Sequence, residues 1–514
     1  MKYAIAVIDI GMTNKKIVIY NDSLEQLDIR YKTFKPKIID NLETHDLQGM
    51  ETWFIAELKA LAEKYPIKVL AVSTHGGTFV CLGEDGRIVL PSVYYTHEPG
   101  EQFHHNFYKL FGDVDELQLR TGTPVFMAMI STAKGIFFVQ EKFKEEYKNV
   151  RNILLYPQYW GFRFTGKMGI ESTYIGNHTY LWDQVDNRFS TVTRKLAADT
   201  LMPETLGSPL DVLGTISAEF QEKTGLSGDT IVTLGIHDSN SALLPHFAKK
   251  GEKGFILNST GTWCVIMNPA EKYGFSKSEL GKTVLFNISA FGKPIKTANF
   301  MGGMQFEAWS QLFMKQHGRN DFPVWNEELF HTILKEKKLF LLPEIMPGSG
   351  QFPFSKARVI ENGKPYFFDA QDSLPSCFTD YEKSYAVLHL SLIMQTLTAM
   401  DRAGIKDGDE VYTEGGFRKD ETYNRLLASA LWNNRVFITD IAEATALGTA
   451  MTAKLALSGK SLADPKSQLA DLAVDFEICY QEQEKTFFPE LSAYRAAWLA
   501  EAEEKVDKRS GYSP

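Results

Sequence analysis

A strand, a glycine-containing turn and a second strand open the chain, and the same pattern recurs near its midpoint. The first copy lies within residues 4–20, with Gly11 in its turn, and the second within residues 254–267, with Gly261 in its turn. Such a turn presents backbone N–H groups, hydroxyls and, in the first copy, a cation at one point, which suits a phosphate chain. A hairpin of this kind in each half predicts a duplicated fold whose halves each hold part of a polyphosphate.

The first hairpin also carries a carboxylate that suits a metal. Its opening strand ends around Asp9, and the chain then runs through Thr13 and Asn14 to Lys15 and Lys16. Asp9 would face the turn, where it could hold Mg²⁺ through water, because Mg²⁺ keeps several waters and takes few direct protein ligands. An ordinary hairpin with a polar tip is the alternative interpretation.

The stretch GIHDSNSA, residues 235–242, follows an apolar run typical of a buried strand. Asp238 therefore lies at a strand end, and the Ser-Asn-Ser-Ala behind it is typical of the first turn of a helix, where free backbone N–H groups favour an anion. A carboxylate held there beside His237 suits a general base that takes a proton from an alcohol. A plain helix N-cap is the alternative for Asp238.

Two other glycine pairs follow predicted strands. His75, Gly76, Gly77 and Thr78 come after the strand at residues 67–72 and suit the rim of a small-molecule site, although His75 could equally be a structural histidine. The pair Gly415 and Gly416 follows a short strand and would let a flat ring such as adenine approach the backbone. Any tight turn could use the same pair.

The remaining pattern predicts alternating strands and helices. Helices are expected over residues 47–65, 129–143, 384–403 and 420–432, and Glu171 and Thr173 are expected in a loop, as are residues 341–354. The stretch from Glu443 to Ala450 opens a helix whose small residues permit close packing, so its expected role is structural, and it could also face the cleft.

Length and composition limit the class of protein. A chain of 514 residues is too long for one core and implies two or more domains. The net charge of -9 argues against nucleic acid as a partner. The four cysteines show no paired spacing, no signal peptide is evident at the N-terminus and no segment is long enough for a bilayer span. A cytoplasmic protein that acts on small molecules, without nucleic acid or membrane partners, is expected.

Taken together, these motifs resemble those of the FGGY carbohydrate kinases, over nearly the whole length of the chain. Residues 129–141 are similar to the family's linear signature, and residues 159–166 to its Tyr-Leu...Leu-Thr-Gly segment. Within the family, the sequence looks most like the rhamnulokinase and fuculokinase branch. The motifs that carry the resemblance are Asp9-Ile10-Gly11, His237-Asp238, Ser259-Thr260-Gly261-Thr262 and Gly415-Gly416.

The resemblance implies a two-domain actin-like, ribonuclease H-like α/β fold with a duplicated βββαβα core and a cleft between domains, here residues 1–245 and 246–514. It implies transfer of the γ-phosphate of ATP to a sugar hydroxyl, with Asp238 as the base and Asp9 and Asp238 holding Mg²⁺ through water. The implied ATP-binding residues are Asp9, Gly11, Thr13, Asn14, Lys16, Thr260, Gly261, Thr262, Gly415 and Gly416. The implied sugar-binding residues are His75, Gly76, Gly77, Thr78, Tyr95, His237 and Asp238.

The sugar itself is less constrained than the reaction. Thr78 stands where this branch often carries Asp, and Tyr95-Thr96-His97 replaces an expected Arg-Asp pair, so the sugar pocket differs from that of the branch. L-Rhamnulose or L-fuculose is the expected substrate, with a pentulose (xylulose or ribulose) as the alternative. A non-catalytic actin-like nucleotide-binding protein and an acyl-phosphate kinase of the same fold are the other hypotheses. The sequence leaves open whether the chain forms a homodimer.

Overall fold

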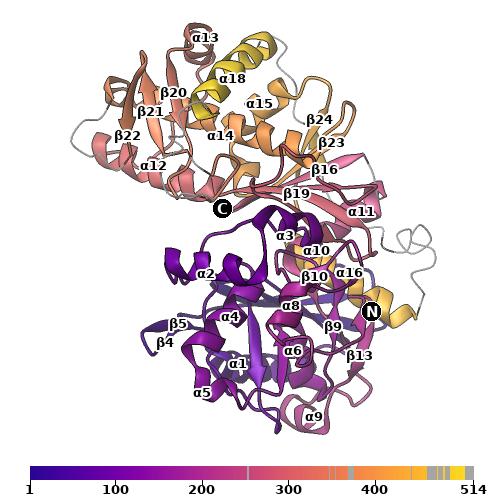
Figure 1. Cartoon of the computed structure of the whole chain (residues 1–514). Helices are drawn as coiled ribbons and strands as arrows, with labels where there is room; N and C mark the ends of the chain where they lie inside the picture. Colours follow the sequence, from indigo (N-terminus) through magenta and orange to yellow (C-terminus); the bar gives the residue numbers. More distant parts are fainter. Residues whose placement is uncertain are drawn as a thin grey trace.

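The computed structural model describes residues 1–251, 254–346, 348–353, 355–368, 375–441, 443–459, 472, 478–480 and 487–503. These residues form two lobes, each built around a seven-stranded sheet (Figure 1). In the first sheet, an antiparallel meander leads into strands parallel to β1, and β13 closes the edge. Its strands are β1 (Ala4–Ile10), β2 (Asn14–Asn21), β3 (Gln26–Thr33), β6 (Ile67–Thr74), β13 (Val212–Thr215), β14 (Ile231–Thr233) and β15 (Ile236–His237).

The second sheet repeats this plan. Its first strand, β16, pairs antiparallel with β17 and parallel with β23, which in turn pairs parallel with β24. The predicted duplication and fold class are therefore confirmed. The strands of this sheet are β16 (Phe255–Thr260), β17 (Cys264–Pro269), β18 (Val284–Ile288), β19 (Pro294–Phe300), β23 (Glu410–Gly415), β24 (Arg435–Thr439) and β25 (Ile478–Tyr480).

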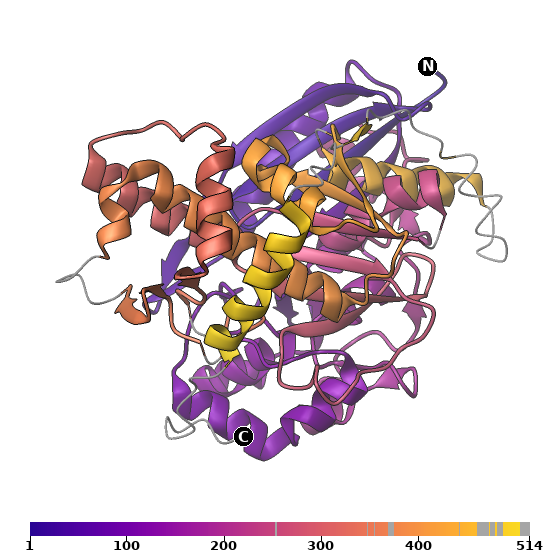
Figure 2. The ribbon, with the colours of Figure 1, turned by 90° about the horizontal axis from the view of Figure 1, so that it is seen from above.

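Helices cover the outer face of each sheet. Alternate residues of β1 point to opposite faces, so Ala6 and Ile8 join an outer core with helices α1, α4 and α6, whereas Ile5 and Val7 face inward. The outer helices of the first sheet are α1 (Leu47–Ala62), α4 (Thr132–Lys142) and α6 (Tyr156–Thr165). Those of the second are α12 (Gly302–His317), α13 (Glu327–Glu336), α14 (Tyr381–Ala403), α15 (Glu421–Ala430) and α18 (Phe488–Glu503). Helix α18 packs against α13, α14 and α15 (Figure 2).

A third core lies between the two sheets. It contains the inward residues Ile5 and Val7 of β1 and Phe255 and Leu257 of β16, together with three helices. These are α10 (Asp238–Ala242), α11 (Leu244–Lys250) and α16 (Ala444–Ser458). Although α16 belongs to the second half of the sequence, it packs on β1, β6 and α10 of the first lobe (Figure 1).

The helix α16 crosses α10 without space for a side chain. A Cβ placed on Gly448 would lie 1.8 Å from the carbonyl oxygen of Ser241, whose hydroxyl donates to the Thr445 carbonyl at 2.8 Å. The small residues predicted to allow close helix packing are thus explained by this crossing. Because Asp238 is the first residue of α10, the crossing also ties the position of that carboxylate to the second half of the chain.

Shorter elements connect these layers. They are β4 (Lys37–Ile39), β5 (Leu42–Thr44), β7 (Phe79–Leu82), α2 (Glu101–Phe111), α3 (Val114–Thr121), α5 (Lys144–Tyr147), β8 (Asn152–Leu155), β9 (Ile170–Glu171), α7 (Ser172–Ile175), β10 (Trp182–Asp183), β11 (Arg188–Phe189), α8 (Thr191–Lys195), β12 (Leu206–Gly207), α9 (Ala218–Thr224), β20 (Leu339–Leu342), β21 (Arg358–Glu361), β22 (Lys364–Phe367), η1 (Ser376–Thr379) and η2 (Gly416–Lys419).

The structure corrects the sequence analysis in three places. Glu171 and Thr173 do not lie in a loop: Glu171 ends β9 and its carboxylate accepts the N–H groups of Thr173 and Tyr174, which caps the four-residue helix α7. Such a short helix has no periodicity to detect. Strand β20 continues to Leu342, inside the stretch expected to be loop, and the helix expected from residue 129 begins at Thr132.

Among the described residues, none of the helices combines the length and the apolar character that a membrane crossing requires.

Candidate functional site

Three neighbouring strands of the first sheet end at one place and bring distant residues together. Asp9 of β1 is in register with Ser73 of β6, and Thr74 of β6 is in register with His237 of β15. The Ser73 hydroxyl donates to Asp9 Oδ1 at 3.0 Å. Burial, reinforced by the charge of Asp238 and opposed by Lys16, raises the pKa of Asp9. The two predicted carboxylates therefore act on one another across this edge.

Asp238 is the first residue of α10 and is partly exposed, at 32% of its side chain. Its Oδ1 accepts from the Ser239 N–H at 2.6 Å and lies 3.0 Å from His237 Nδ1. His237 Nδ1 accepts from the same Ser239 N–H at 3.2 Å, which makes His237 the N-cap of α10. Burial alone would raise the pKa of Asp238, but His237, His75 and the Ser239 N–H together hold it below its usual range. Asp238 is therefore ionised at neutral pH, as a general base must be.

The predicted sugar rim surrounds Gly76, and it includes a histidine that the sequence analysis did not identify. A Cβ on Gly76 would lie 2.5 Å from His178 Nε2 and 2.7 Å from His237 Nε2, so both rings rest against this glycine. The ring of Tyr95 packs 5.5 Å from that of His75, and the charge of Asp238 helps to raise the pKa of Tyr95 to about 12, with burial as the larger cause.

Gly77 and Thr78 occupy the back of this rim. Gly77 has φ of +74°, and a Cβ there would lie 2.9 Å from the carbonyl oxygen of Ile130. Thr78 is fully buried, and its backbone N–H and C=O are both bound by the Tyr174 hydroxyl, at 3.0 and 2.8 Å. The backbone of Thr78 is thus anchored to the buried Tyr174 beneath the rim.

A buried carboxylate supports the strand that carries His237. Glu171 accepts the Thr173 hydroxyl proton at 2.9 Å, and the same hydroxyl oxygen accepts the backbone N–H of His237 at 3.1 Å. Glu171 and Thr173 are both fully buried. This chain of hydrogen bonds fixes the backbone immediately before Asp238, and only the three-dimensional fold reveals it.

A hydrogen bond from Gly11 N–H to Asn14 O, at 3.0 Å, closes the turn of the first hairpin. Lys15 is buried, and its ammonium donates to the carbonyl oxygens of Gly11 and Met12 at 2.9 and 2.7 Å. Burial lowers the pKa of Lys15 to about 8. Thr13 is exposed at the tip, where its hydroxyl is accessible. The Asn14 side chain instead accepts from the Thr33 hydroxyl at 2.8 Å.

Lys16 points to the opposite side from Lys15, toward the carboxylates. Its Nζ lies 3.4 Å from Asp9 Oδ2 and 2.5 Å from Oε2 of Glu443 at the start of α16. The Tyr31 hydroxyl donates to the other oxygen of Glu443 at 2.6 Å. Glu443, which opens a stretch expected to be structural or to face the cleft, thus joins the first phosphate hairpin to the second half of the chain.

The second hairpin meets the predicted adenosine motif directly. Thr260 is in register with Gly415, and its hydroxyl donates to the Glu414 carbonyl and accepts the Phe417 N–H at 2.9 Å. Gly415 has φ of +79°, and a Cβ there would lie 1.8 Å from the Thr260 carbonyl oxygen, so only glycine fits. The fold thus places residues predicted to bind one nucleotide side by side although about 150 positions separate them.

The segment next to the Gly261 turn approaches it with backbone atoms rather than with side chains. Gly303 at the start of α12 approaches the tip so closely that a Cβ would lie 2.0 Å from the Gly261 carbonyl oxygen, and Met304 N–H donates to Thr262 O at 3.3 Å. Gly416 opens η2. The side chain of Glu414 is buried and lies 2.6 Å from His246 Nε2, away from the glycine pair.

Two family models match the sequence, one in each half of the chain. Residues 4–245 match "FGGY family of carbohydrate kinases, N-terminal domain", and residues 252–461 match "Carbohydrate kinase FGGY, C-terminal domain". The chain belongs to the FGGY family of carbohydrate kinases.

Individual members of the FGGY family are similar to the chain at low identity. The rhamnulokinase of Enterococcus faecalis is 27% identical over 233 residues, which are 43% of this chain and 45% of that protein. The chain spans about half the length of the curated relatives it matches.

Solved structures share the FGGY fold over nearly the whole chain. A carbohydrate kinase from Novosphingobium aromaticivorans superposes with a TM-score of 0.77 at 24% identity, covering 97% of this chain and 98% of that one. A ligand-bound xylulose kinase from Lactobacillus acidophilus gives a TM-score of 0.77 at 15% identity, covering 96% of both chains. These likenesses establish the fold.

The donor set of this FGGY member fits a hydrated Mg²⁺. Asp9 and Asp238 offer carboxylate oxygens, which Mg²⁺ prefers, from two strand ends whose charges act on one another. Among the described residues, no group of three or more His, Cys, Asp or Glu side chains is arranged for direct metal binding. A metal held mainly by water and phosphate does not require such a group.

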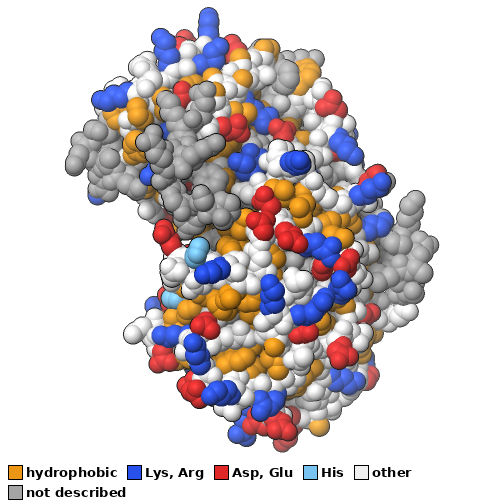
Figure 3. Space-filling model, viewed as in Figure 1, with side chains coloured by type: hydrophobic (Ala, Val, Ile, Leu, Met, Phe, Trp, Pro, Cys, Tyr) orange, Lys and Arg blue, Asp and Glu red, His pale blue; other side chains and the backbone are white. Residues whose placement is uncertain are grey.

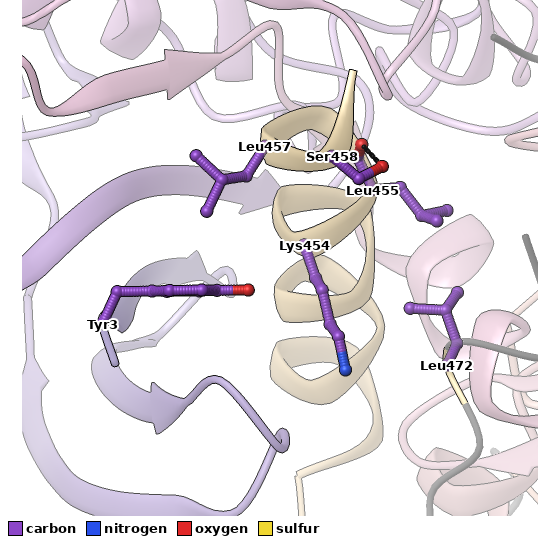
Figure 4. Close-up of a pocket in the computed structure, with 6 residues that line it drawn as sticks. All are labelled: Tyr3, Lys454, Leu455, Leu457, Ser458 and Leu472. Atoms are coloured by element: carbon purple, nitrogen blue, oxygen red, sulfur yellow. Dashed lines mark hydrogen bonds between the residues drawn. The ribbon is translucent and has the colours of Figure 1, made fainter. Parts of the chain in front are cut away.

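A separate cavity of about 470 Å³ lies at the other end of α16 from Glu443. Its lining is largely apolar, with the Tyr3 and Lys454 side chains entering from β1's lobe and from α16 (Figure 4). None of the candidate site residues lines it. The space-filling view shows the surface indented where the two lobes meet (Figure 3).

Proposed function

We propose that the chain transfers the γ-phosphate of ATP to a hydroxyl of an uncharged ketose. The observation that carries this proposal is the placement of the ionised Asp238, beside a rim of histidines, at the same sheet edge as Asp9 and the phosphate hairpin. A base next to a polar pocket and next to a polyphosphate site is what phosphoryl transfer to an alcohol needs, because catalysis of that reaction rests on positioning and charge neutralisation.

The roles of the residues follow from their positions. Asp238 takes the proton of the attacking hydroxyl, and the Ser239 N–H, which His237 Nδ1 also accepts, orients the carboxylate. Lys16, Thr13 and the Gly11 turn hold the terminal phosphates, and Asp9 and Asp238 hold Mg²⁺ through water. The metal, when bound, neutralises phosphate charge.

The second lobe holds the rest of the nucleotide in this proposal. The turn Thr260–Gly261–Thr262 contacts the phosphates, and the Gly415–Gly416 turn next to it takes the adenosine. Closure of the lobes excludes water and protects ATP from hydrolysis. The availability of ATP also favours a cytoplasmic location.

For the substrate, we propose L-rhamnulose or L-fuculose. The curated relatives that match at low identity include several rhamnulokinases, which supports a 6-deoxyketohexose. A pentulose is the second candidate, because a shorter match of 93 residues is 33% identical to a protein named ribulokinase 2 from Staphylococcus saprophyticus.

The test is ADP release from Mg-ATP with a panel of L-rhamnulose, L-fuculose, L-ribulose and D-xylulose, for the wild type and for Asp238→Asn. The wild type should turn over one sugar well above the rate without sugar. The variant keeps the shape of the side chain but loses the base, so turnover should be abolished while the affinity for ATP is nearly unchanged. ATP binding without turnover of any sugar would favour the non-catalytic alternative, and a variant with more than a few per cent of wild-type turnover would remove Asp238 from the role.

A further inference from the structure

One edge of the second sheet rests on the first lobe. Among the described strands of that sheet, β18 is the outermost on its side, and it pairs with β19. Alternate residues of such an edge strand turn their backbone N–H and C=O groups away from the partner strand, where these groups need other partners. In β18 the residues concerned are 284, 286 and 288, and each of them is hydrogen-bonded to the first lobe.

Two of these positions are bound by α3 and by a glutamine near it in space. Gln118 of α3 is fully buried and donates to the Val284 carbonyl oxygen at 2.8 Å. The Phe286 N–H donates to the carbonyl oxygen of Gly122, which follows α3, at 3.0 Å, and the Phe286 carbonyl oxygen accepts from Gln184 at 2.7 Å. The first lobe therefore holds the backbone of β18 at successive positions, where the two lobes meet (Figure 1).

The third position is bound by the helix that carries Asp238. Asn240 of α10 is fully buried, and its Nδ2 donates to the Ile288 carbonyl oxygen at 2.7 Å. A carbonyl can only accept, so this contact decides which way the amide is turned. The Oδ1 atom of Asn240 is buried and has no hydrogen-bond partner in the described part of the chain. The bond to Ile288 is therefore the interaction that orients this side chain.

Helix α10 depends on such contacts for its position. It has five residues, with Asn240 two positions after Asp238, and so short a helix is held by its tertiary contacts rather than by its own stability. Helix α16 also holds α10, through Ser241, but α16 packs on β1 and β6 of the first lobe, whereas β18 belongs to the second sheet. The bond from Asn240 to Ile288 thus connects the helix of the base directly to the second sheet.

We propose that Asn240 is a positioning residue, which makes the location of the Asp238 carboxylate depend on the docking of β18 against the first lobe. The inference rests on the proposed kinase function. With β18 docked, the Ile288 carbonyl holds Asn240 and thereby the backbone of α10. When the lobes separate along this edge, that bond breaks and α10 loses one of its supports. A displacement of about 1 Å at a catalytic group costs about a hundredfold in rate, so the base is effective only while the two lobes are joined at β18.

The test compares the loss of this bond with the loss of an equivalent bond farther from Asp238. Asn240→Leu keeps the branched shape of the side chain and removes the donor, and Asn240→Ala removes the same donor and is used if the leucine variant does not fold. Gln118→Met is the matched control, because it removes a buried amide that donates to the same strand at Val284. The readouts are steady-state ADP release from Mg-ATP with the best sugar of the panel, the Kd for ATP, the melting temperature, and hydrogen exchange of a peptide that spans residues 236–244.

Asn240→Leu should lower kcat about ten- to hundredfold, while the KM for the sugar and the Kd for ATP stay within about twofold of wild type, because the base is displaced and the binding residues are not. The amides of residues 236–244 should exchange faster than in the wild type, because α10 has lost a support. Gln118→Met should lower the melting temperature by a similar amount but keep kcat within about twofold of wild type, because the contacts of Gln184, Gly122 and Asn240 still dock β18.

Each other outcome has a distinct meaning. A wild-type kcat in the Asn240 variants, a change confined to the KM for the sugar, or an equal loss of kcat in Asn240→Leu and Gln118→Met would overturn the positioning role and leave the kinase function standing. Faster exchange of residues 236–244 in Asn240→Leu but not in Gln118→Met, without turnover of any sugar by the wild type, would support the connection from β18 to α10 and reject the kinase function. Unchanged exchange of residues 236–244 together with no turnover would reject both.

Discussion

Substitution of Gly448 by alanine should impair catalysis from a position that touches neither substrate. The new Cβ would lie 1.8 Å from the Ser241 carbonyl oxygen and 2.6 Å from its carbonyl carbon, both backbone atoms of α10. Ordinary contact begins at about 3.4 Å, so α16 and α10 must separate by about 1.6 Å. Overpacking of this kind costs about 1–3 kcal/mol of stability, and a displacement of about 1 Å at a catalytic group costs about a hundredfold in rate.

The assay is steady-state kinetics with the best sugar of the panel, combined with urea unfolding. Gly448→Ala should lower kcat about ten- to hundredfold and the free energy of unfolding by about 1–3 kcal/mol, with a folded circular-dichroism spectrum retained. Gly459→Ala is the control: that glycine ends the same helix with φ of +62° and nothing near its Cβ, so the variant should lose about 1 kcal/mol of stability without a change in kcat. A Gly448→Ala enzyme with wild-type kcat would refute the coupling of α16 to the base.

Three further changes test separate parts of the site. Lys16→Ala should raise the Kd for ATP at least tenfold, while the affinity for sugar, measured by the shift in melting temperature, stays close to wild type. Glu443→Gln should raise the Kd for ATP by a smaller factor. If Lys16→Ala selectively lost sugar binding, Lys16 would not be a phosphate-binding residue. Thr173→Val leaves the buried His237 N–H without an acceptor and should lower kcat about tenfold without weakening ATP binding, as single-turnover kinetics would show. Burial lowers the pKa of Lys134 to about 7. Between that pH and about 10.4, the Lys134 side chain is protonated in the unfolded chain but not in the folded chain, so this residue makes the free energy of unfolding rise with pH. Lys134→Met should reduce that rise when urea unfolding is measured at pH 7.5 and 9.5, and an identical rise in both proteins would contradict the burial argument.

Local patterns in the sequence carry much of the fold and the centre of the candidate site. The two hairpins and the strand before Asp238 are visible because apolar runs and glycines mark them, and the equivalent strand pairing in both halves follows from the duplication. The meeting of Thr260 with Gly415 follows only from the fold, and no local pattern predicts it.

Other site residues leave no local signal. His178 lies in an irregular segment, and its importance arises from a left-handed backbone and from contact with Gly76, about 100 positions earlier. Glu171 caps a helix too short to show a period, and the ion pair between Glu443 and Lys16 spans 427 positions. Propensity and periodicity describe neighbours along the chain, so contacts of this kind require the three-dimensional fold.

The placement of α16 between the sheets affects how the protein is made. The inner face of the first sheet, with Ile5, Val7, Val69 and Ala71, is covered largely by residues 444–458, which are synthesised long after the strands of that sheet. During synthesis, that apolar face stays uncovered while the 372 residues between Ala71 and Ala444 emerge, a condition that promotes aggregation and chaperone binding. An N-terminal fragment ending near residue 245 would therefore be expected to be poorly soluble, and co-expression of a peptide that supplies α16 should improve its yield.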